Sequence, residues 1–143
     1  MVPNSLDRFI NAQINTYEKA LAEIKNGKKR THWMWFIFPQ LQELGTSSIS
    51  RHYGISGYEE AKAYLEHPVL SERLYEICGA LLEHKDKSTL EIFGDIDEMK
   101  LKSSMTLFAL VSENYTIFDE VLRLYFDGEM DELTVKLIHD QTT

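Results

Sequence analysis

The chain has 143 residues, a formal net charge of −8 and a single cysteine, with 43% hydrophobic and 27% charged residues. This length and composition are typical of one globular domain that needs no disulfide bridge to stabilise its core. A lone cysteine cannot form an intramolecular disulfide, which favours a reducing compartment. The acidic balance excludes general nucleic-acid binding, because phosphate backbones repel such a surface.

No segment approaches the ~20 apolar residues that cross a bilayer, since the longest apolar run covers only residues 33–38. The N-terminus also lacks the basic-then-apolar pattern of an export signal. We therefore expect a cytoplasmic protein without a membrane partner. The sequence leaves the oligomeric state open.

The first predicted helix begins at Asn4 or Ser5, either of which can cap a helix N-terminus. Apolar residues at three- and four-residue spacing, interrupted by Gln13, continue along one face as far as Ile24. The Asn-Gly pair at 26–27 then tolerates the left-handed conformation of a helix C-cap. The spacing therefore predicts one continuous helix.

The other elements are also predicted to be helical, because no segment alternates in the manner of a strand. The aromatic block 31–41 is apolar on every side and is predicted to form a short buried helix, disturbed near Pro39. Further helices are predicted over 47–53, 57–66, from Pro68 onward, and over 88–93, 95–111, 117–126 and 131–141. In the 95–111 helix, the residues predicted to face inward are Ile96, Met99, Ser103, Leu107 and Leu110. The predicted fold class is all-α, one compact orthogonal domain over 1–143 with roughly seven to nine helices.

Several catalytic motifs are absent from the sequence. It contains no HExxH, no paired cysteines, no glycine-rich phosphate loop and no GxSxG elbow. The five histidines are scattered along the chain. No metal site and no cofactor are therefore predicted.

The aromatic block contains both tryptophans, Trp33 and Trp35, between His32 and Gln40. One interpretation is a stacking wall for a flat ring, with His32 or Gln40 donating hydrogen bonds and the basic residues 28–30 near a phosphate. The alternative is that the block fills the core.

Two further polar residues are candidates for ligand contacts. Gln13 interrupts an apolar stripe, where an unpaired amide costs roughly 1–3 kcal/mol, so it contacts either a neighbouring backbone or a ligand. Arg51 suits bidentate recognition of a phosphate or carboxylate, although exposed arginines are common.

A third candidate is a polar face in the late helix, where Lys100, Ser103 and Ser104 lie together. A serine activated by a neutral lysine is one interpretation. A polar gap between helices that accepts a ligand is another, and small serines that allow close helix packing are the third.

Several stretches of the sequence form a recognisable pattern: Arg8-Phe9, Ala12-Gln13, His32 through Gln40, Tyr53-Gly54-Ile55, Glu60 through Leu65, His67 through Leu70 and Lys100 through Phe108. Together they resemble a bacterial family, the domain of unknown function numbered eighteen-ten. The resemblance extends over nearly the whole chain and is most specific in HWMWFIFPQ and KLKSSMTLF. Some members are labelled calpastatin, a disordered inhibitor, which does not fit the patterned apolar content here.

A more distant similarity is to the all-helical NADAR group. That resemblance implies ADP-ribose or N-glycosidic chemistry, which for an enzyme would mean a hydrolase of a nucleotide-like metabolite. The glutamate–histidine pair of that group has no clear counterpart, and Gln13 or His32 would have to stand near its place.

Two functional hypotheses follow from these patterns. The first is a pocket for a small phosphorylated, ring-bearing metabolite, lined by the 32–40 block, Arg51 and the Lys100–Ser104 face. The second is a protein-interaction module whose acidic C-terminal helices, with Asp131 and Glu132, contact a basic partner.

Overall fold

The computed structural model describes residues 6–142, which form ten α-helices and one 3₁₀ helix, η1. Within that part of the chain no strand occurs, and the nearest approach to one is an isolated parallel bridge between Leu41 and Ile55. The predicted all-α class is confirmed. The helices are α1 (Asp7–Gln13), α2 (Tyr17–Lys25), α3 (Met34–Ile37), η1 (Gln42–Leu44), α4 (Ser48–His52), α5 (Tyr58–Glu66), α6 (Pro68–Leu82), α7 (Thr89–Phe93), α8 (Asp95–Leu110), α9 (Ile117–Phe126) and α10 (Glu132–Thr142).

The predicted first helix is in fact two helices, α1 and α2. The chain turns between them, where the Thr16 amide donates to the Gln13 carbonyl at 3.2 Å, and the side chain of Ile14 is 62% exposed. Isoleucine, asparagine and threonine at 14–16 all have modest helix propensity, but the apolar spacing continues across the turn and hides it. The predicted caps, Asn4 and Ser5, lie outside the described residues.

Most of the other predicted boundaries are confirmed, and local capping explains them. Ser47, Ser88 and Thr116 each form a capping box with the residue three positions later, so α4, α7 and α9 begin where a side chain accepts a free backbone N–H. Pro68 occupies the first turn of α6, and Gly94 takes a φ of 84° between α7 and α8.

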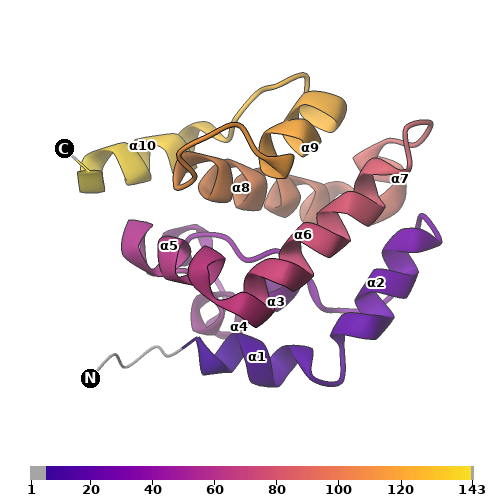
Figure 1. Cartoon of the computed structure of the whole chain (residues 1–143), viewed down its shortest axis with the longest axis horizontal. Helices are drawn as coiled ribbons and strands as arrows, with labels where there is room; N and C mark the ends of the chain where they lie inside the picture. The colour runs from indigo at the N-terminus through magenta and orange to yellow at the C-terminus, as the bar shows by residue number, and fades with distance from the viewer. Residues whose placement is uncertain (1–5, 143) are drawn as a thin grey trace.

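Helix α6 runs obliquely through the middle of the molecule (Figure 1). The C-terminal helices α8, α9 and α10 lie on one side of it in this view, and α1 to α4 lie on the other. Helix α6 contacts α1, α2, α5 and α9, while α8 contacts α5, α7, α9 and α10. The two longest helices therefore join the N-terminal and C-terminal halves of the chain.

The core is one contiguous cluster of apolar side chains with many aromatic rings. Trp33 contacts Phe38 and Phe93, and Tyr64 contacts Phe9 and Phe108, with ring centroids 5.2–6.4 Å apart. Such spacings are favourable for tilted and edge-to-face pairs. No helix of the described part is both long and apolar enough to span a membrane.

The predicted inner face of α8 is wrong in its first half. Ile96 and Met99 are 74% and 66% exposed, whereas Ser103 and Leu107 on the same face are buried. Helical periodicity identifies the face of a helix, but neighbouring helices decide how far along that face is covered.

Candidate functional site

The aromatic block begins as part of the core. Trp33 is fully buried, and its Nε1 donates to the Glu23 carboxylate at 2.9 Å. Trp35, on α3, is only half-buried. His32 precedes α3 and is exposed. The two tryptophans therefore occupy different environments, and Trp35 is the one that reaches the surface.

Glu23 is a buried carboxylate that holds the chain entering α3. It accepts hydrogen bonds from the Arg30 and Thr31 amides, the Thr31 hydroxyl and Trp33, at 2.7–3.1 Å. Burial alone would raise its pKa, but these four donors outweigh that and lower the pKa to about 2. The basic residues 28–30 therefore belong to a structured turn anchored by Glu23, a role that no motif in the sequence indicates.

A small hollow adjoins Trp35. Its volume is about 10 Å³, which is the space of about one water molecule. Its lining includes the polar residues Gln40, Ser50 and Lys100 and the loop residues Tyr53 and Gly54. We call this site the Trp35–Lys100 hollow. It brings together three of the predicted site residues, Trp35, Gln40 and Lys100, although Trp35 and Lys100 lie 65 positions apart in the sequence.

Beside the hollow, two lysine side chains share one carboxylate, so positive charge exceeds negative charge there. Lys100 Nζ lies over the Trp35 ring, 5.2 Å from its centroid, and 3.8 Å from the Asp97 carboxylate. Lys29 Nζ lies closer to the same carboxylate, at 2.9 Å, and over the Trp33 ring at 5.1 Å. One carboxylate thus faces two ammonium groups, so these three side chains carry a net positive charge in an acidic protein.

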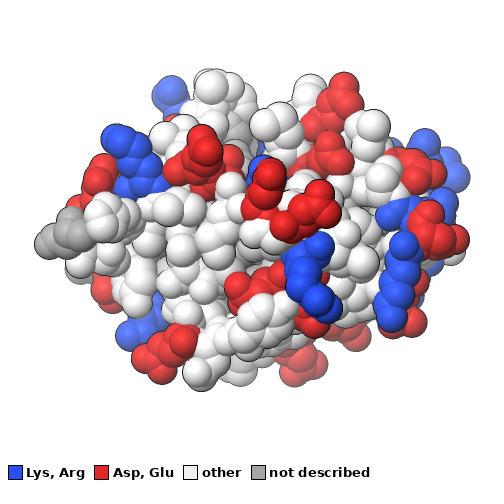
Figure 2. Space-filling model, turned by 90° about the horizontal axis from the view of Figure 1, so that it is seen from above, with Lys and Arg blue, Asp and Glu red and all other residues white. Residues whose placement is uncertain are grey.

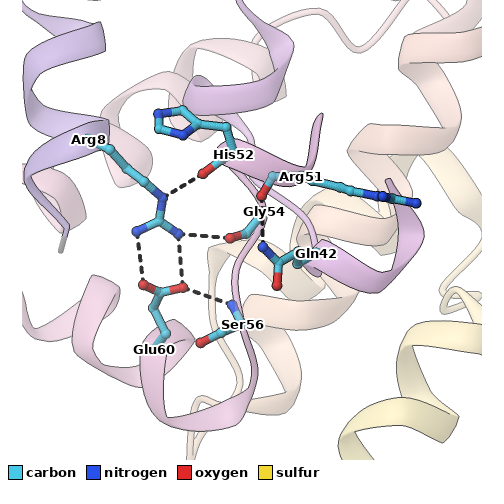
Figure 3. Close-up of polar contacts among 7 residues, drawn as sticks. All are labelled: Arg8, Gln42, Arg51, His52, Gly54, Ser56 and Glu60. Carbon is cyan, nitrogen blue, oxygen red and sulfur yellow. Dashed lines mark hydrogen bonds and ion pairs between the residues drawn. The ribbon is translucent and has the colours of Figure 1, made fainter. Parts of the chain in front are cut away.

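The loop that walls the hollow is held by Arg8 of α1 (Figure 3). Arg8 donates through Nε to the His52 carbonyl and through Nη2 to the Gly54 carbonyl, both at 2.8 Å. It also forms a bidentate pair with Glu60 at 3.0 Å, and Glu60 accepts from the Ser56 amide at 2.8 Å. We call this arrangement the Arg8–Glu60 clamp.

Gln13 is 2% exposed and has hydrogen-bond partners within the protein. Its Nε2 donates to the Phe36 carbonyl at 2.7 Å and lies 3.2 Å from the Tyr64 hydroxyl, and its Oε1 accepts from Arg73 at 3.2 Å. Burial raises the pKa of Tyr64, although the bond to Gln13 opposes that shift. These contacts connect α1 to α3, α5 and α6. Of the two roles predicted for Gln13, they match the contact within the protein and not the contact with a ligand.

Arg51 is exposed on α4, next to the hollow-lining Ser50. Its Nε makes one long hydrogen bond, 3.4 Å, to the Gly45 carbonyl. Figure 3 shows its side chain pointing away from the Arg8–Glu60 clamp. Arg51 and the clamp therefore do not form one basic cluster.

Ser103 and Ser104 are buried on α8. Among the described residues, no hydrogen bond joins Lys100 to either serine, and the Ser104 hydroxyl has no partner at all. Lys100 instead covers Trp35, so the two elements of a Ser–Lys nucleophile are not in contact in this conformation.

Over the described residues, no group of three or more His, Cys, Asp or Glu side chains is placed to hold a metal ion. Figure 2 shows acidic and basic side chains interspersed over the face seen from above, with uncharged stretches between them. On that face the acids do not form one continuous patch.

The sequence pointed to three residues that line the hollow, Trp35, Gln40 and Lys100, but not to the residues that hold its surroundings in place. Arg8, Tyr53 and Glu60 lie in the stretches that resemble the family, but no pattern assigned them a role. Asp97 lies in the first turn of α8, where an acid complements the helix dipole whether or not it has a further partner. The long-range contacts of Arg8, Glu60 and Asp97 span 44 to 68 positions of the chain, and local spacing in the sequence does not predict contacts over such separations.

Three comparisons place the chain among known proteins. A search of curated proteins finds no match. The structure is similar to the crystal structure of the conserved hypothetical protein Rv1873 from Mycobacterium tuberculosis, with a TM-score of 0.93, 45% sequence identity, and coverage of 96% of this chain and 99% of that chain. The model of the family described as "Protein of unknown function (DUF1810)" matches residues 3–138, and the chain belongs to that family.

Proposed function

We propose that this chain binds a small anionic metabolite with a flat ring, of the nucleotide or ADP-ribose kind, at the Trp35–Lys100 hollow. The observation that carries the proposal is the position of Lys100, whose ammonium covers a half-buried indole while sharing its carboxylate partner with Lys29. Lys29 is the nearer and more buried partner of Asp97, at 2.9 Å and 8% side-chain exposure. Lys100 is therefore the cation available to a ligand.

The size of the hollow limits how such a ligand would lie. A space of about 10 Å³ holds one oxygen atom of a phosphate or carboxylate, not a ring. In the proposed complex, one ligand oxygen occupies the hollow beside the Gln40 amide and Lys100. The ring then stacks on the outer part of Trp35 after the lysine has moved off the indole face.

Two features support a nucleotide-like ligand over a simple anion. Trp35 offers a flat apolar surface, and the side-chain amide of Gln40 has no hydrogen-bond partner among the described residues, so it is free to donate or accept. The ADP-ribose part of the proposal rests on the distant resemblance of the sequence to the NADAR group. His32 and Arg51 do not line the hollow, and they remain predicted contacts to parts of the ligand outside it.

The test is a thermal-shift panel with inorganic phosphate, AMP, ADP-ribose, NAD and sugar phosphates. A ligand at a hundred times its dissociation constant adds roughly 2.7 kcal/mol, which raises the melting temperature by several degrees. We expect a shift with at least one ring-bearing phosphate and a smaller shift with phosphate alone.

The variants Lys100→Met and Lys102→Met form a matched pair on α8. Both remove one ammonium, but Lys102 pairs with Glu129 and lies over Phe126, away from Trp35. Loss of a charge-assisted contact costs roughly 1.5–3 kcal/mol, so Lys100→Met should weaken binding by about tenfold or more. Equal binding by the two variants, or no shift across the panel, would contradict the proposal.

A further inference from the structure

Two parts of the lining of the Trp35–Lys100 hollow differ in how firmly they are held. One, the loop wall, is the loop of residues 52–56, which contributes Tyr53 and Gly54, and the other, the Lys100 wall, is the Lys100 side chain. The rest of the lining comes from α3, the segment that follows it and Ser50. A space of about 10 Å³ has to widen before more than one ligand atom can enter.

The loop wall is tied to α1 and α5 by the Arg8–Glu60 clamp. Arg8 donates to two loop carbonyls, His52 and Gly54, and Glu60 accepts from the loop amide of Ser56 (Figure 3). The side chains of Arg8 and Glu60 are each only 9% exposed, so solvent competes poorly for these contacts.

The same loop is tied from the opposite side to the segment that follows α3. The Ile55 amide donates to the Gln40 carbonyl and the Gln42 amide donates to the Ile55 carbonyl, both at 2.8 Å. At Gly54 the two backbones approach so closely that a Cβ atom would lie 2.4 Å from the Cα of Gln42. The loop is therefore held between two neighbours.

The Lys100 wall is held much more weakly. Its one ion pair is 3.8 Å long, to a carboxylate that already has a closer partner in Lys29. A lysine side chain also changes rotamer at little cost. Moving Lys100 breaks this long ion pair and its contact with the Trp35 ring, whereas moving the loop breaks at least five hydrogen bonds.

We infer that Arg8 and Glu60 are positioning residues, which fix the 52–56 loop as the rigid wall of the hollow so that the site opens only on its Lys100 side. This inference rests on the proposed function for its biological meaning. It concerns the free protein, however, and can be tested without a ligand.

The experiment compares Arg8→Lys with Arg123→Lys. Lysine keeps the charge but cannot serve two carbonyls and a carboxylate at once. Arg123 forms an equivalent 3.0 Å pair with Glu120 at 74% exposure, far from the loop in sequence, and so serves as the control. Arg8→Lys should speed hydrogen exchange of the Ile55 and Ser56 amides by about tenfold or more, and should raise quenching of tryptophan fluorescence by neutral acrylamide. Because Trp33 is fully buried, the added quenching reports on Trp35.

Glu60→Gln is the second variant, for the case that Arg8→Lys does not fold. It retains an acceptor for Ser56 but loses the charge that faces Arg8, and it should raise exchange and quenching by a smaller factor. The inference is overturned if the folded variants have a lower melting temperature while Ile55 and Ser56 exchange, and acrylamide quenching, match those of Arg123→Lys. Titration of the wild-type protein with AMP is a separate arm. Its failure would count against the proposed function and would leave the result on the loop unchanged.

Discussion

Glu23 shows how a single buried acid can organise a turn. It receives four hydrogen bonds from residues 30–33, and these lower its pKa from 4.5 to about 2. A carboxyl whose folded pKa is depressed stabilises the protein above its unfolded pKa, and this stabilisation is lost as the pH falls through the folded value. The loss should therefore occur between about pH 4.5 and pH 2.

We predict that Glu23→Gln lowers the free energy of unfolding at pH 7 by roughly 1–3 kcal/mol, because a neutral amide is a weaker acceptor for these donors. The difference from wild type should shrink as the pH falls from about 4.5 to about 2. Urea unfolding across this pH range measures it. Glu113→Gln, in an exposed turn, is the control, and identical pH profiles for the two variants would refute the role given to Glu23.

Two hydroxyl groups on α8 provide a second contrast. The Ser104 hydroxyl is buried without a partner, whereas the Thr106 hydroxyl donates to the Lys102 carbonyl at 2.8 Å and accepts from the Asp131 amide at 2.9 Å. Ser104→Ala should leave stability unchanged or raise it by up to about 1 kcal/mol, and Thr106→Val should lower it by roughly 1–2 kcal/mol. Chemical denaturation decides between them, and a larger loss from Ser104→Ala would indicate a partner for that hydroxyl.

At the residue scale, the sequence could predict which buried polar side chains need hydrogen-bond partners, but it could not identify those partners. Gln13 was identifiable because an amide on an apolar stripe is costly when unpaired. Its partners, Phe36, Tyr64 and Arg73, lie 23 to 60 positions away. Glu23 could not be identified from the sequence, because two of its four donors are backbone amides of a turn, which no residue type reveals.

At the scale of elements, two glycines have opposite tolerances for a side chain. A Cβ atom added at Gly54 would lie 2.4 Å from the Cα of Gln42. A Cβ atom added at Gly79 in α6 would lie 4.0 Å from its nearest neighbour outside the helix backbone, the Ile117 Cδ1. Gly54→Ala should therefore be strongly destabilising, by more than about 2 kcal/mol. Gly79→Ala should be stabilising by roughly 0.5–1 kcal/mol, since alanine is the better helix former.

Melting temperatures of the two glycine variants test this pair of expectations directly. If Gly54→Ala melts at the wild-type temperature, the backbones do not approach as closely as described. The loop would then have no steric reason to be rigid.

Element boundaries were predictable wherever a local rule determines them. Capping serines, Pro68 and Gly94 mark the ends of their helices in the sequence itself. The break between α1 and α2 was not predictable, because the apolar spacing continues through it. The exposure of Ile96 and Met99 in the first half of α8 was not predictable either. Their spacing places them on the inner face of the helix, but none of the described helices covers that part of the face.

At the scale of the whole molecule, the all-α class followed from the periodicity, while the assembly of the site did not. The aromatic block, the loop after α4 and α8 meet at the hollow only in the folded chain. Sequence reasoning named Trp35, Gln40 and Lys100 from their chemistry. Their shared location, and the clamp behind them, required the fold.

The proposed function requires an available positive charge on Lys100 beside Trp35. Its test is quenching of tryptophan fluorescence at low ionic strength by iodide, an anion, compared with quenching by neutral acrylamide. We expect the ratio of iodide quenching to acrylamide quenching to be high in the wild type and in Lys102→Met and to be lower in Lys100→Met. In the wild type the ratio should also fall when salt is added, since salt screens exposed charges. A ratio that is the same in Lys100→Met and Lys102→Met would contradict the claim that this site attracts anions.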